Sequence, residues 1–172
     1  TEQLADCHVI KTLAKLATLH KAKGNIQRAL ETTEEILRIQ KVSQELDEFQ
    51  RAIEVSITLR SVSELYRAIG NLEQAVSFSY ESVRTLDDAK RAAPPERSSR
   101  FTNDIIFIEQ LISSMLLLGS IYHEQAEPVL ANIVFRQALQ AISSSACRTS
   151  PGLVTLNEVT TMLVASGCAP QA

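Results

Sequence analysis

The sequence predicts an all-α protein built from antiparallel helical hairpins that stack side by side. Three observations lead to this fold class. The 172 residues are 45% apolar and include only 5 Gly and 5 Pro, which leaves few turn formers for an all-β chain. Apolar residues recur at helical spacing along most of the chain. Two turn signals, Gly24-Asn25 and Gly70-Asn71, stand 46 residues apart between similar flanks, which indicates an internal repeat.

Seven helices are expected, of which six pair into hairpins. Their predicted ranges are 2–22, 25–44, 46–69, 71–92, 103–124, 127–146 and 153–166. The predicted hairpins are 2–44, 46–92 and 103–146, the helix 153–166 caps the last of them, and residues 1–172 form one domain. Two prolines in the stretch 93–102 forbid a helix there and predict an exposed loop.

The Gly-Asn pairs predict how two of the hairpins turn. Glycine adopts the left-handed backbone conformation that ends a helix, and the asparagine side chain then caps the helix that follows. Gln74 stands three residues after Asn71, which is the capping-box spacing.

The second helix of each predicted hairpin carries one apolar stripe, which predicts its buried face. The stripes comprise Ile26, Ala29, Leu30, Thr33, Ile36 and Leu37, then Leu72, Ala75, Val76, Tyr80 and Val83, and then Ala131, Val134, Phe135, Ala138, Leu139 and Ile142.

The predicted helix 103–124 is apolar in nearly every direction and is expected to be covered on all sides. Glu109, Gln110 and three serines interrupt it, so a buried helix fits better than a membrane span. In the alternative interpretation, its outer face or that of 153–166 meets a partner protein or a second copy of the chain.

Composition argues against several function classes. The formal net charge of −3 disfavours a nucleic-acid binder. Cys7, Cys147 and Cys168 form no CxxC pair, so we expect no disulfide framework, no metal site and a reducing, cytoplasmic location. The three histidines lie in different predicted helices, and the sequence contains no phosphate-binding glycine loop and no GxSxG motif. We therefore expect neither enzymatic activity nor a cofactor.

The repeated pattern resembles the tetratricopeptide repeat. The third copy matches the family pattern best, and the second and first copies depart from it at Ser79 and Ser82 and at Thr33 and Ile36. Ala126 stands where the family has its turn glycine. The spacing of 46 and then 56 residues exceeds the family period of 34, so the chain resembles the long-repeat, kinesin-light-chain-like variety. The matching residues are Leu13, Leu16, Ala17, His20, Gly24 and Ala29; Leu59, Val62, Ser63, Tyr66, Gly70 and Ala75; and Met115, Leu118, Gly119, Tyr122, Ala131, Phe135 and Ala138.

This resemblance implies a right-handed superhelix whose concave face is lined by the first helix of each hairpin. It implies a non-enzymatic scaffold or adaptor that holds a peptide or helix of a partner protein in that concave groove, with no nucleic acid and no membrane span. The implied binding residues are Lys11, Thr18, Lys21, Arg60, Glu64, Arg67, Ser113, Ser120 and His123, with Ala14, Ile57 and Leu116 beside them. The lysines and arginines among them favour an acidic segment as ligand.

Two other interpretations stay open. In the first, the polar residues of that face are ordinary solvated helix surface. The chain is alternatively a structural subunit, packed through its apolar C-terminal helices into a larger complex or a homodimer.

Overall fold

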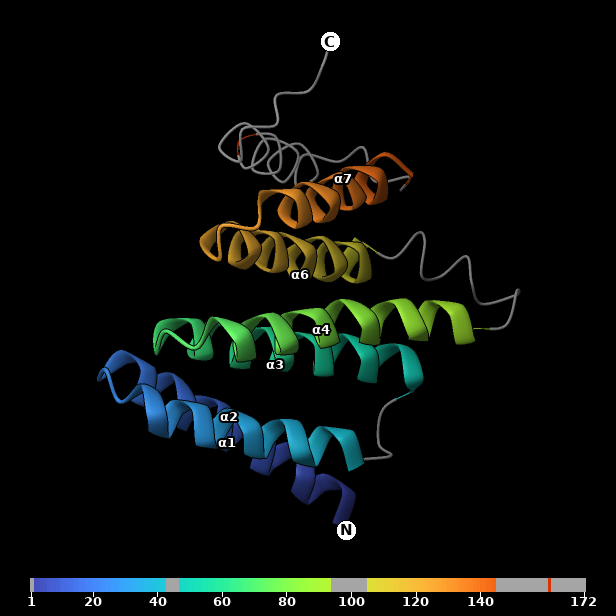
Figure 1. Cartoon of the computed structure of the whole chain (residues 1–172). Helices are drawn as coiled ribbons and strands as arrows, with labels where there is room; N and C mark the ends of the chain where they lie inside the picture. Colours follow the sequence, from blue (N-terminus) through green and yellow to red (C-terminus); the bar gives the residue numbers. More distant parts are fainter. Residues whose placement is uncertain (1, 43–46, 94–104, 145–160, 162–172) are drawn as a thin grey trace. The chain divides into compact units, whose positions relative to one another are not determined.

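The computed structural model describes residues 2–42, 47–93, 105–144 and 161. These residues form six helices and no strand: α1 (Glu2–Ala22), α2 (Ile26–Val42), α3 (Glu48–Ala68), α4 (Leu72–Ala92), α6 (Ile105–Glu124) and α7 (Pro128–Ser144) (Figure 1). All six correspond to predicted helices, and each described end lies within about two residues of its expected place. The predicted capping helix 153–166, apart from residue 161, and nearly all of the predicted loop 93–102 lie outside the described residues. The right-handed superhelix stays a prediction.

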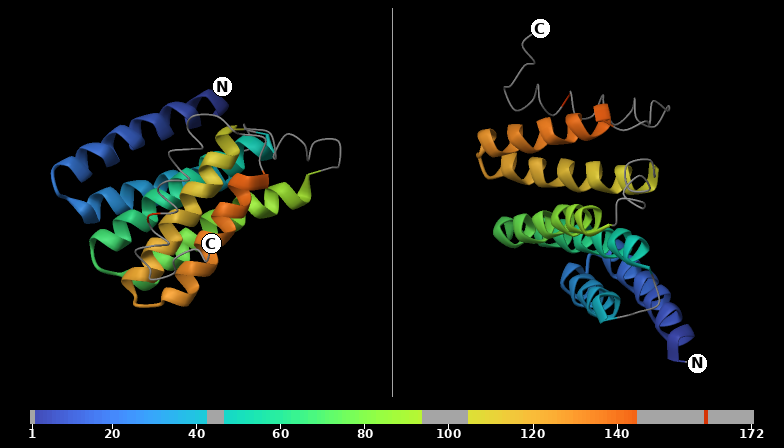
Figure 2. Two further views of the ribbon diagram at one scale, coloured as in Figure 1. Left: turned by 90° about the horizontal axis from the view of Figure 1, so that it is seen from above. Right: turned by 90° about the vertical axis from the view of Figure 1, so that its right-hand side faces the viewer.

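The chain divides into two compact units, Thr1–Thr85 and Leu86–Ala172, and the boundary falls within α4. In the first unit, α1 and α3 both pack on α2. In the second unit, α6 and α7 run antiparallel and side by side (Figure 2). The single domain expected for residues 1–172 stays a prediction.

In each of the three hairpins, one turn joins the two helices, and all three turns are of the same type. After α1, the amide of Gly24 donates to the carbonyl of Lys21, and the amide of Asn25 donates to that of His20. The same two hydrogen bonds recur one repeat later and again after α6. This pattern is the Schellman motif, which requires a left-handed residue just past the helix end. The left-handed residues are Gly24 (φ 74°), Gly70 (φ 81°) and Ala126 (φ 60°).

The predicted cap at Asn71 is confirmed. Its side-chain oxygen accepts a hydrogen bond of 3.1 Å from the amide of Gln74, three residues on. Asn25 begins α2 through its backbone, because its carbonyl accepts from the amide of Ala29. The start of α3 has a cap of the same kind, in which Asp47 accepts from the amide of Gln50 at 2.7 Å.

The core of the first unit lies between α2, α3 and the first part of α4. Ala29 and Leu30 pack against Val62 and Leu65, and Leu37 packs against Val55 and Leu59. Phe78 of α4 contacts both clusters and stacks on the ring of Tyr66, with centroids 5.3 Å apart. The apolar stripe expected on α2 is thus buried as predicted.

The stripe predicted on α4 was wrong at Tyr80, whose side chain is 55% exposed. Ser79 and Ser82 are fully buried instead. The Ser82 hydroxyl donates to the carbonyl of Ser56 at 3.0 Å, and the Ser63 hydroxyl donates to the carbonyl of Ala75 at 2.7 Å. Small hydroxyl side chains therefore let α4 approach α3 closely while their polar atoms stay paired.

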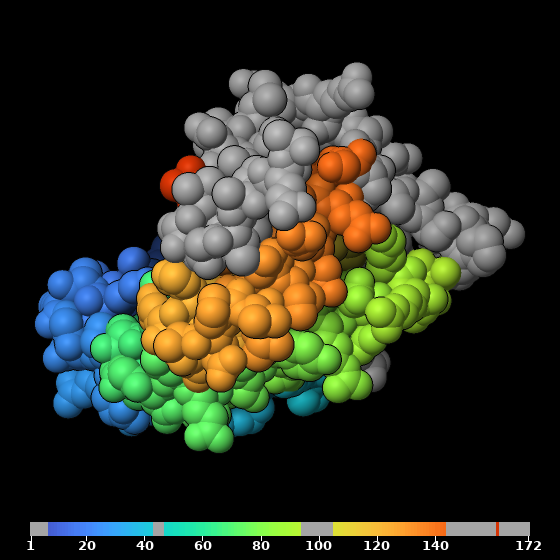
Figure 3. Space-filling model, turned by 45° about the horizontal axis from the view of Figure 1, so that its top comes forward, coloured from blue at the N-terminus to red at the C-terminus, as the bar shows by residue number. Residues whose placement is uncertain are grey.

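The second unit packs α6 closely against α7. Ten residues of α6 are buried, and α7 buries Ala131, Val134, Phe135 and Ala138. The expectation that α6 is covered on all sides holds only in part, because Ile105 and Ile106 in its first turn are exposed. Among the described helices, α6 is long and apolar enough to cross a membrane, and 56% of its most apolar stretch is buried inside the fold. α7, orange in Figure 3, lies at the surface, and its exposed side chains include Val129, Leu130 and Ile133.

Candidate functional site

A groove with a volume of about 400 Å³ opens between α1 and α3, and α2 forms its floor. It arises because α1 and α3 both pack on α2 through one side, which leaves their facing surfaces uncovered. Most of the side chains along it are small or apolar. The lining residues are Ile10, Ala14, Ala17, Thr18 and Lys21 of α1, Ala29, Thr33, Ile36 and Gln40 of α2, and Glu54, Ile57, Thr58, Ser61 and Leu65 of α3.

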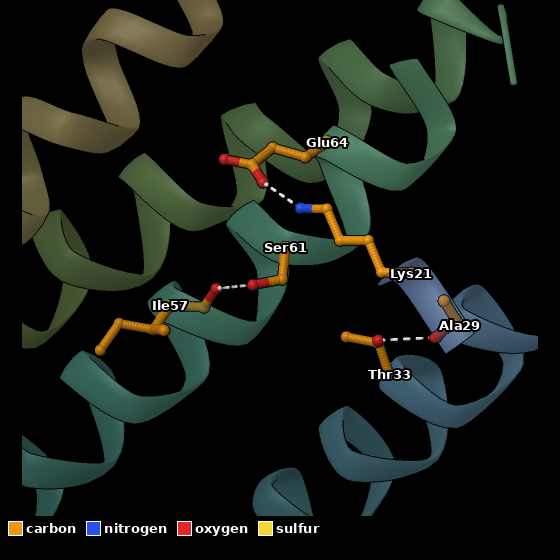
Figure 4. A network of polar contacts seen from close by, with 6 residues as sticks. All are labelled: Lys21, Ala29, Thr33, Ile57, Ser61 and Glu64. Carbon is orange, nitrogen blue, oxygen red and sulfur yellow. Dashed lines mark hydrogen bonds and ion pairs between the residues drawn. The ribbon is translucent and has the colours of Figure 1, made fainter. Parts of the chain in front are cut away.

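Four hydroxyl side chains line the groove, and each donates its proton to its own helix. Thr18 donates to the carbonyl of Ala14 at 2.8 Å, and Thr33 donates to that of Ala29 at 2.7 Å. Thr58 and Ser61 each donate at 3.1 Å to the carbonyl four residues before. Figure 4 shows the bonds of Thr33 and Ser61. A hydroxyl has one proton, so these four oxygens can act toward a ligand as acceptors.

An ion pair joins the two walls near one end of the groove. Lys21, in the last turn of α1, lies with its Nζ 3.3 Å from the Oε2 of Glu64 on α3 (Figure 4). Both side chains are about half exposed. Water screens such a pair, which contributes roughly 0.2–1 kcal/mol to stability. The contact therefore positions the two side chains more than it holds the walls together.

The opposite end of the groove contains Gln40, near the end of α2, and Glu54, near the start of α3. Gln40 is 6% exposed, and its Oε1 atom is buried without a hydrogen-bond partner. Glu54 is half buried, and no described residue pairs with its carboxylate. A buried acceptor without a donor is unfavourable, so this end of the groove contains a polar atom whose hydrogen bonding is not satisfied.

The predicted binding residues divide into those at the groove and those away from it. Thr18 and Lys21 line it, and Glu64 meets Lys21 at its edge. Lys11 is exposed on α1 outside the lining, and Arg67 is half buried in the last turn of α3. In the second unit, Ser113 and Ser120 are half buried on α6, and His123 is exposed in its last turn.

Arg60 is half buried on α3 and is not part of the lining. Burial lowers the pKa of its guanidinium below the usual value, and the nearby Glu64 partly offsets this effect. One of its guanidinium nitrogens, Nη1, is buried without a hydrogen-bond partner. Of the four basic residues expected to attract an acidic ligand, Lys21 alone lines the groove, and it is already paired.

Sequence reasoning missed the floor of the groove and its acidic end. Ala29, Thr33, Ile36 and Gln40 follow helical spacing along one face of α2, and this face is small or polar at three of its four positions. Three of these four residues belong to the stripe predicted to be buried, and Gln40, one turn further on, is the polar residue from which the groove could have been recognised. Among the described residues, no group of three or more His, Cys, Asp or Glu side chains is placed to hold a metal ion.

The likeness to known proteins is structural. No family model matches the chain, and no curated protein matches its sequence. Among solved structures, it is similar to BtubC (BKLC) from P. vanneervenii, with a TM-score of 0.64 and 17% sequence identity over 92% of this chain and 57% of that one. The chain thus spans little more than half the length of BtubC. The likeness supports a tetratricopeptide-like helical-repeat fold.

Proposed function

We propose that this helical-repeat chain is a non-enzymatic interaction module, a scaffold or adaptor that holds a segment of a partner protein in the groove between α1 and α3. The groove supports this function because it is lined mainly by small and apolar side chains, which let another polypeptide approach the helices closely. The helical-repeat fold agrees with it, since such repeats present extended binding surfaces.

The observation that carries this proposal is a polar atom in the groove that has no hydrogen-bond partner. Gln40 keeps a buried acceptor without a donor, although most buried polar groups in proteins are paired. Gln40 lines the groove, so a rotation of its side chain would bring this oxygen within reach of the N–H groups of a bound polypeptide. The free energy gained by pairing this acceptor would then contribute to binding rather than to folding.

A bulky side chain in the groove tests the proposal. Ala14 lines the groove and is exposed, so Ala14→Trp fills space without displacing core residues. The matched control is Ala68→Trp, at an exposed position of α3 outside the lining. We expect Ala14→Trp to weaken binding of the partner recovered with the unaltered chain by tenfold or more, and Ala68→Trp to leave it unchanged. Equal affinities of both variants would rule out this groove.

A second candidate function, that of a structural subunit, is favoured by α7. Val129 is 69% exposed and Ile133, one turn later, is 48% exposed, with Leu130 beside them. Three large apolar side chains on one helix face suit a packed interface. If this face forms a homodimer, light scattering with size exclusion will give twice the chain mass, and Ile133→Lys will restore the monomer. A monomeric unaltered chain would exclude self-association.

A further inference from the structure

We infer that the groove between α1 and α3 selects a partner segment that carries arginine or lysine among apolar residues. This inference rests on the proposed function and names the chemistry of its ligand. It is the reverse of the acidic ligand that the lysines and arginines of the sequence favoured. The reason lies in which polar atoms the groove presents and which of them are already paired.

The groove presents acceptors and almost no free donors. The hydroxyls of Thr18, Thr33, Thr58 and Ser61 have each used their proton on a carbonyl of the same helix. Thr18 is exposed and Ser61 half buried, so their remaining lone pairs are available to a ligand as acceptors, whereas Thr33 and Thr58 are buried in the floor and wall. Gln40 adds a buried carbonyl oxygen that accepts from no donor. A ligand rich in N–H groups satisfies these atoms, and a carboxylate satisfies none of them.

The charges of the lining favour the same ligand. Among the described residues that line the groove, Lys21 and Glu54 are the ones with a basic or an acidic side chain. Lys21 is paired with Glu64, whereas no described residue pairs with Glu54. A cation that enters the groove therefore meets an available carboxylate, while an anion must first compete with Glu64 for Lys21.

Arginine suits the end of the groove where Gln40 and Glu54 lie. Its guanidinium carries five N–H donors in a planar fork, so one side chain can donate to a carboxylate and to a second acceptor together. Its aliphatic stem can lie against apolar lining such as Ile10 and Ile57. Lysine supplies the charge with fewer directed donors and is expected to bind more weakly.

Three matched peptides test the inference with the full chain. Each is acetyl-Ser-Leu-Ala-Xaa-Ala-Leu-Ser-amide, with Arg, Gln or Glu at Xaa, titrated in about 0.1 M salt while NMR records the groove methyl groups. We expect the Arg peptide to bind about tenfold more tightly than the Gln peptide, which is the effect of one charge-assisted hydrogen bond. The Glu peptide is expected to bind most weakly.

Two variants connect this preference to named atoms. Glu54→Gln is expected to reduce the Arg preference to about twofold, and Glu31→Gln, at an exposed position of α2 outside the lining, to leave it intact. Gln40→Leu is expected to weaken the Arg peptide several-fold while the melting temperature stays equal or rises, because an unpaired buried acceptor is removed. A merely structural role of Gln40 would move both quantities in the same direction.

The outcomes separate the inference from the proposed function. Tighter binding of the Glu peptide, or an Arg preference that survives Glu54→Gln, overturns the inference and leaves the groove as a binding site. Absence of binding by all three peptides also overturns it, and the Ala14→Trp comparison with the native partner then decides the function independently. If Ala14→Trp has no effect on that partner, the proposed function itself fails.

Discussion

Gly119 of α6 lies so close to Phe135 of α7 that a β-carbon on the glycine would be 2.3 Å from the Cε1 atom of the ring. Phe135 is 1% exposed, so the ring has no open space into which it could turn. The absent side chain of Gly119 is therefore what allows α6 and α7 to enclose a phenylalanine between them.

Gly119→Ala is expected to destabilise the chain, although alanine is the better helix former. Overpacking of this kind costs about 1–3 kcal/mol, which exceeds the gain in helix propensity of about 1 kcal/mol. Urea unfolding followed by circular dichroism measures the change. Combining it with Phe135→Leu removes the obstructing ring, so the alanine should then cost less than it does alone. An alanine variant as stable as the unaltered chain would contradict the contact.

The equivalent pair in the second hairpin is Ser63 and Ser79, which stand 56 residues before Gly119 and Phe135. Both serines are fully buried, and from the repeat we expect them to share one space, as the glycine and the ring do in the third hairpin. Ser79→Phe would give this hairpin the family's aromatic residue, and we expect it to lower the free energy of unfolding by about 1–3 kcal/mol. Adding Ser63→Gly should recover part of the loss. No recovery would show that the two positions do not share one space.

Ala126 adopts the left-handed conformation (φ 60°) that Gly24 and Gly70 adopt in the other two turns. The β-carbon of an alanine costs about 1–2 kcal/mol in that conformation, and the greater freedom of an unfolded glycine offsets part of the relief. Ala126→Gly is therefore expected to stabilise by about 0.5–1 kcal/mol, and Gly70→Ala to destabilise by a similar amount. Thermal unfolding of the two variants should shift in opposite directions. Shifts of the same sign would contradict the backbone assignment.

The ion pair between Lys21 and Glu64 is expected to contribute little to stability. A double-mutant cycle with Lys21→Met and Glu64→Gln should give a coupling energy of about 0.2–1 kcal/mol that vanishes at 1 M salt. The pair of Lys41 and Glu81, 2.8 Å apart and about half exposed, is the matched comparison. A coupling above about 2 kcal/mol would mean that the Lys21 pair clamps the groove.

Tyr66 predicts a loss of stability at alkaline pH. Its hydroxyl donates to Glu34 at 2.9 Å, and burial, this hydrogen bond and the Glu34 charge all raise the pKa of the phenol above 10. A folded pKa above the unfolded one means that the contribution is fully present below about pH 10 and is lost as pH rises through the folded pKa. Urea unfolding at pH 8 and pH 11 should show a steeper loss for the unaltered chain than for Tyr66→Phe. Equal losses would mean that the phenol is not coupled to folding.

Periodicity and turn chemistry predicted the helices and the hairpins well. These features depend on local sequence, such as the glycine of the first two turns and the stripe that begins at Ile26. The prediction that Tyr80 lies in the core was wrong, because tyrosine is more hydrophobic than serine and was therefore preferred to Ser79 and Ser82. The serines are buried since their hydroxyls find partners across or within helices, and residue type alone does not reveal those partners.

The candidate site was predicted only in part for a related reason. Thr18 and Lys21 were assigned through the repeat pattern, which states which face of the first helix is concave. Gln40 and Glu54 belong to the groove because α1 and α3 both pack on α2 without closing over it, and how closely those two helices approach each other cannot be read from the sequence. Likewise, the charge of Lys21 could be read from the sequence, whereas its pairing with Glu64 could not.

The Schellman turns share one hydrogen-bond pattern, although the second and third turns are ten residues further apart than the first and second (56 against 46). The difference in spacing therefore lies outside the turns, each of which closes with the same two backbone hydrogen bonds. A fluorescent reporter or an epitope tag should therefore not be spliced into these reverse turns, because an inserted residue would break the hydrogen bonds that end one helix and lead into the next.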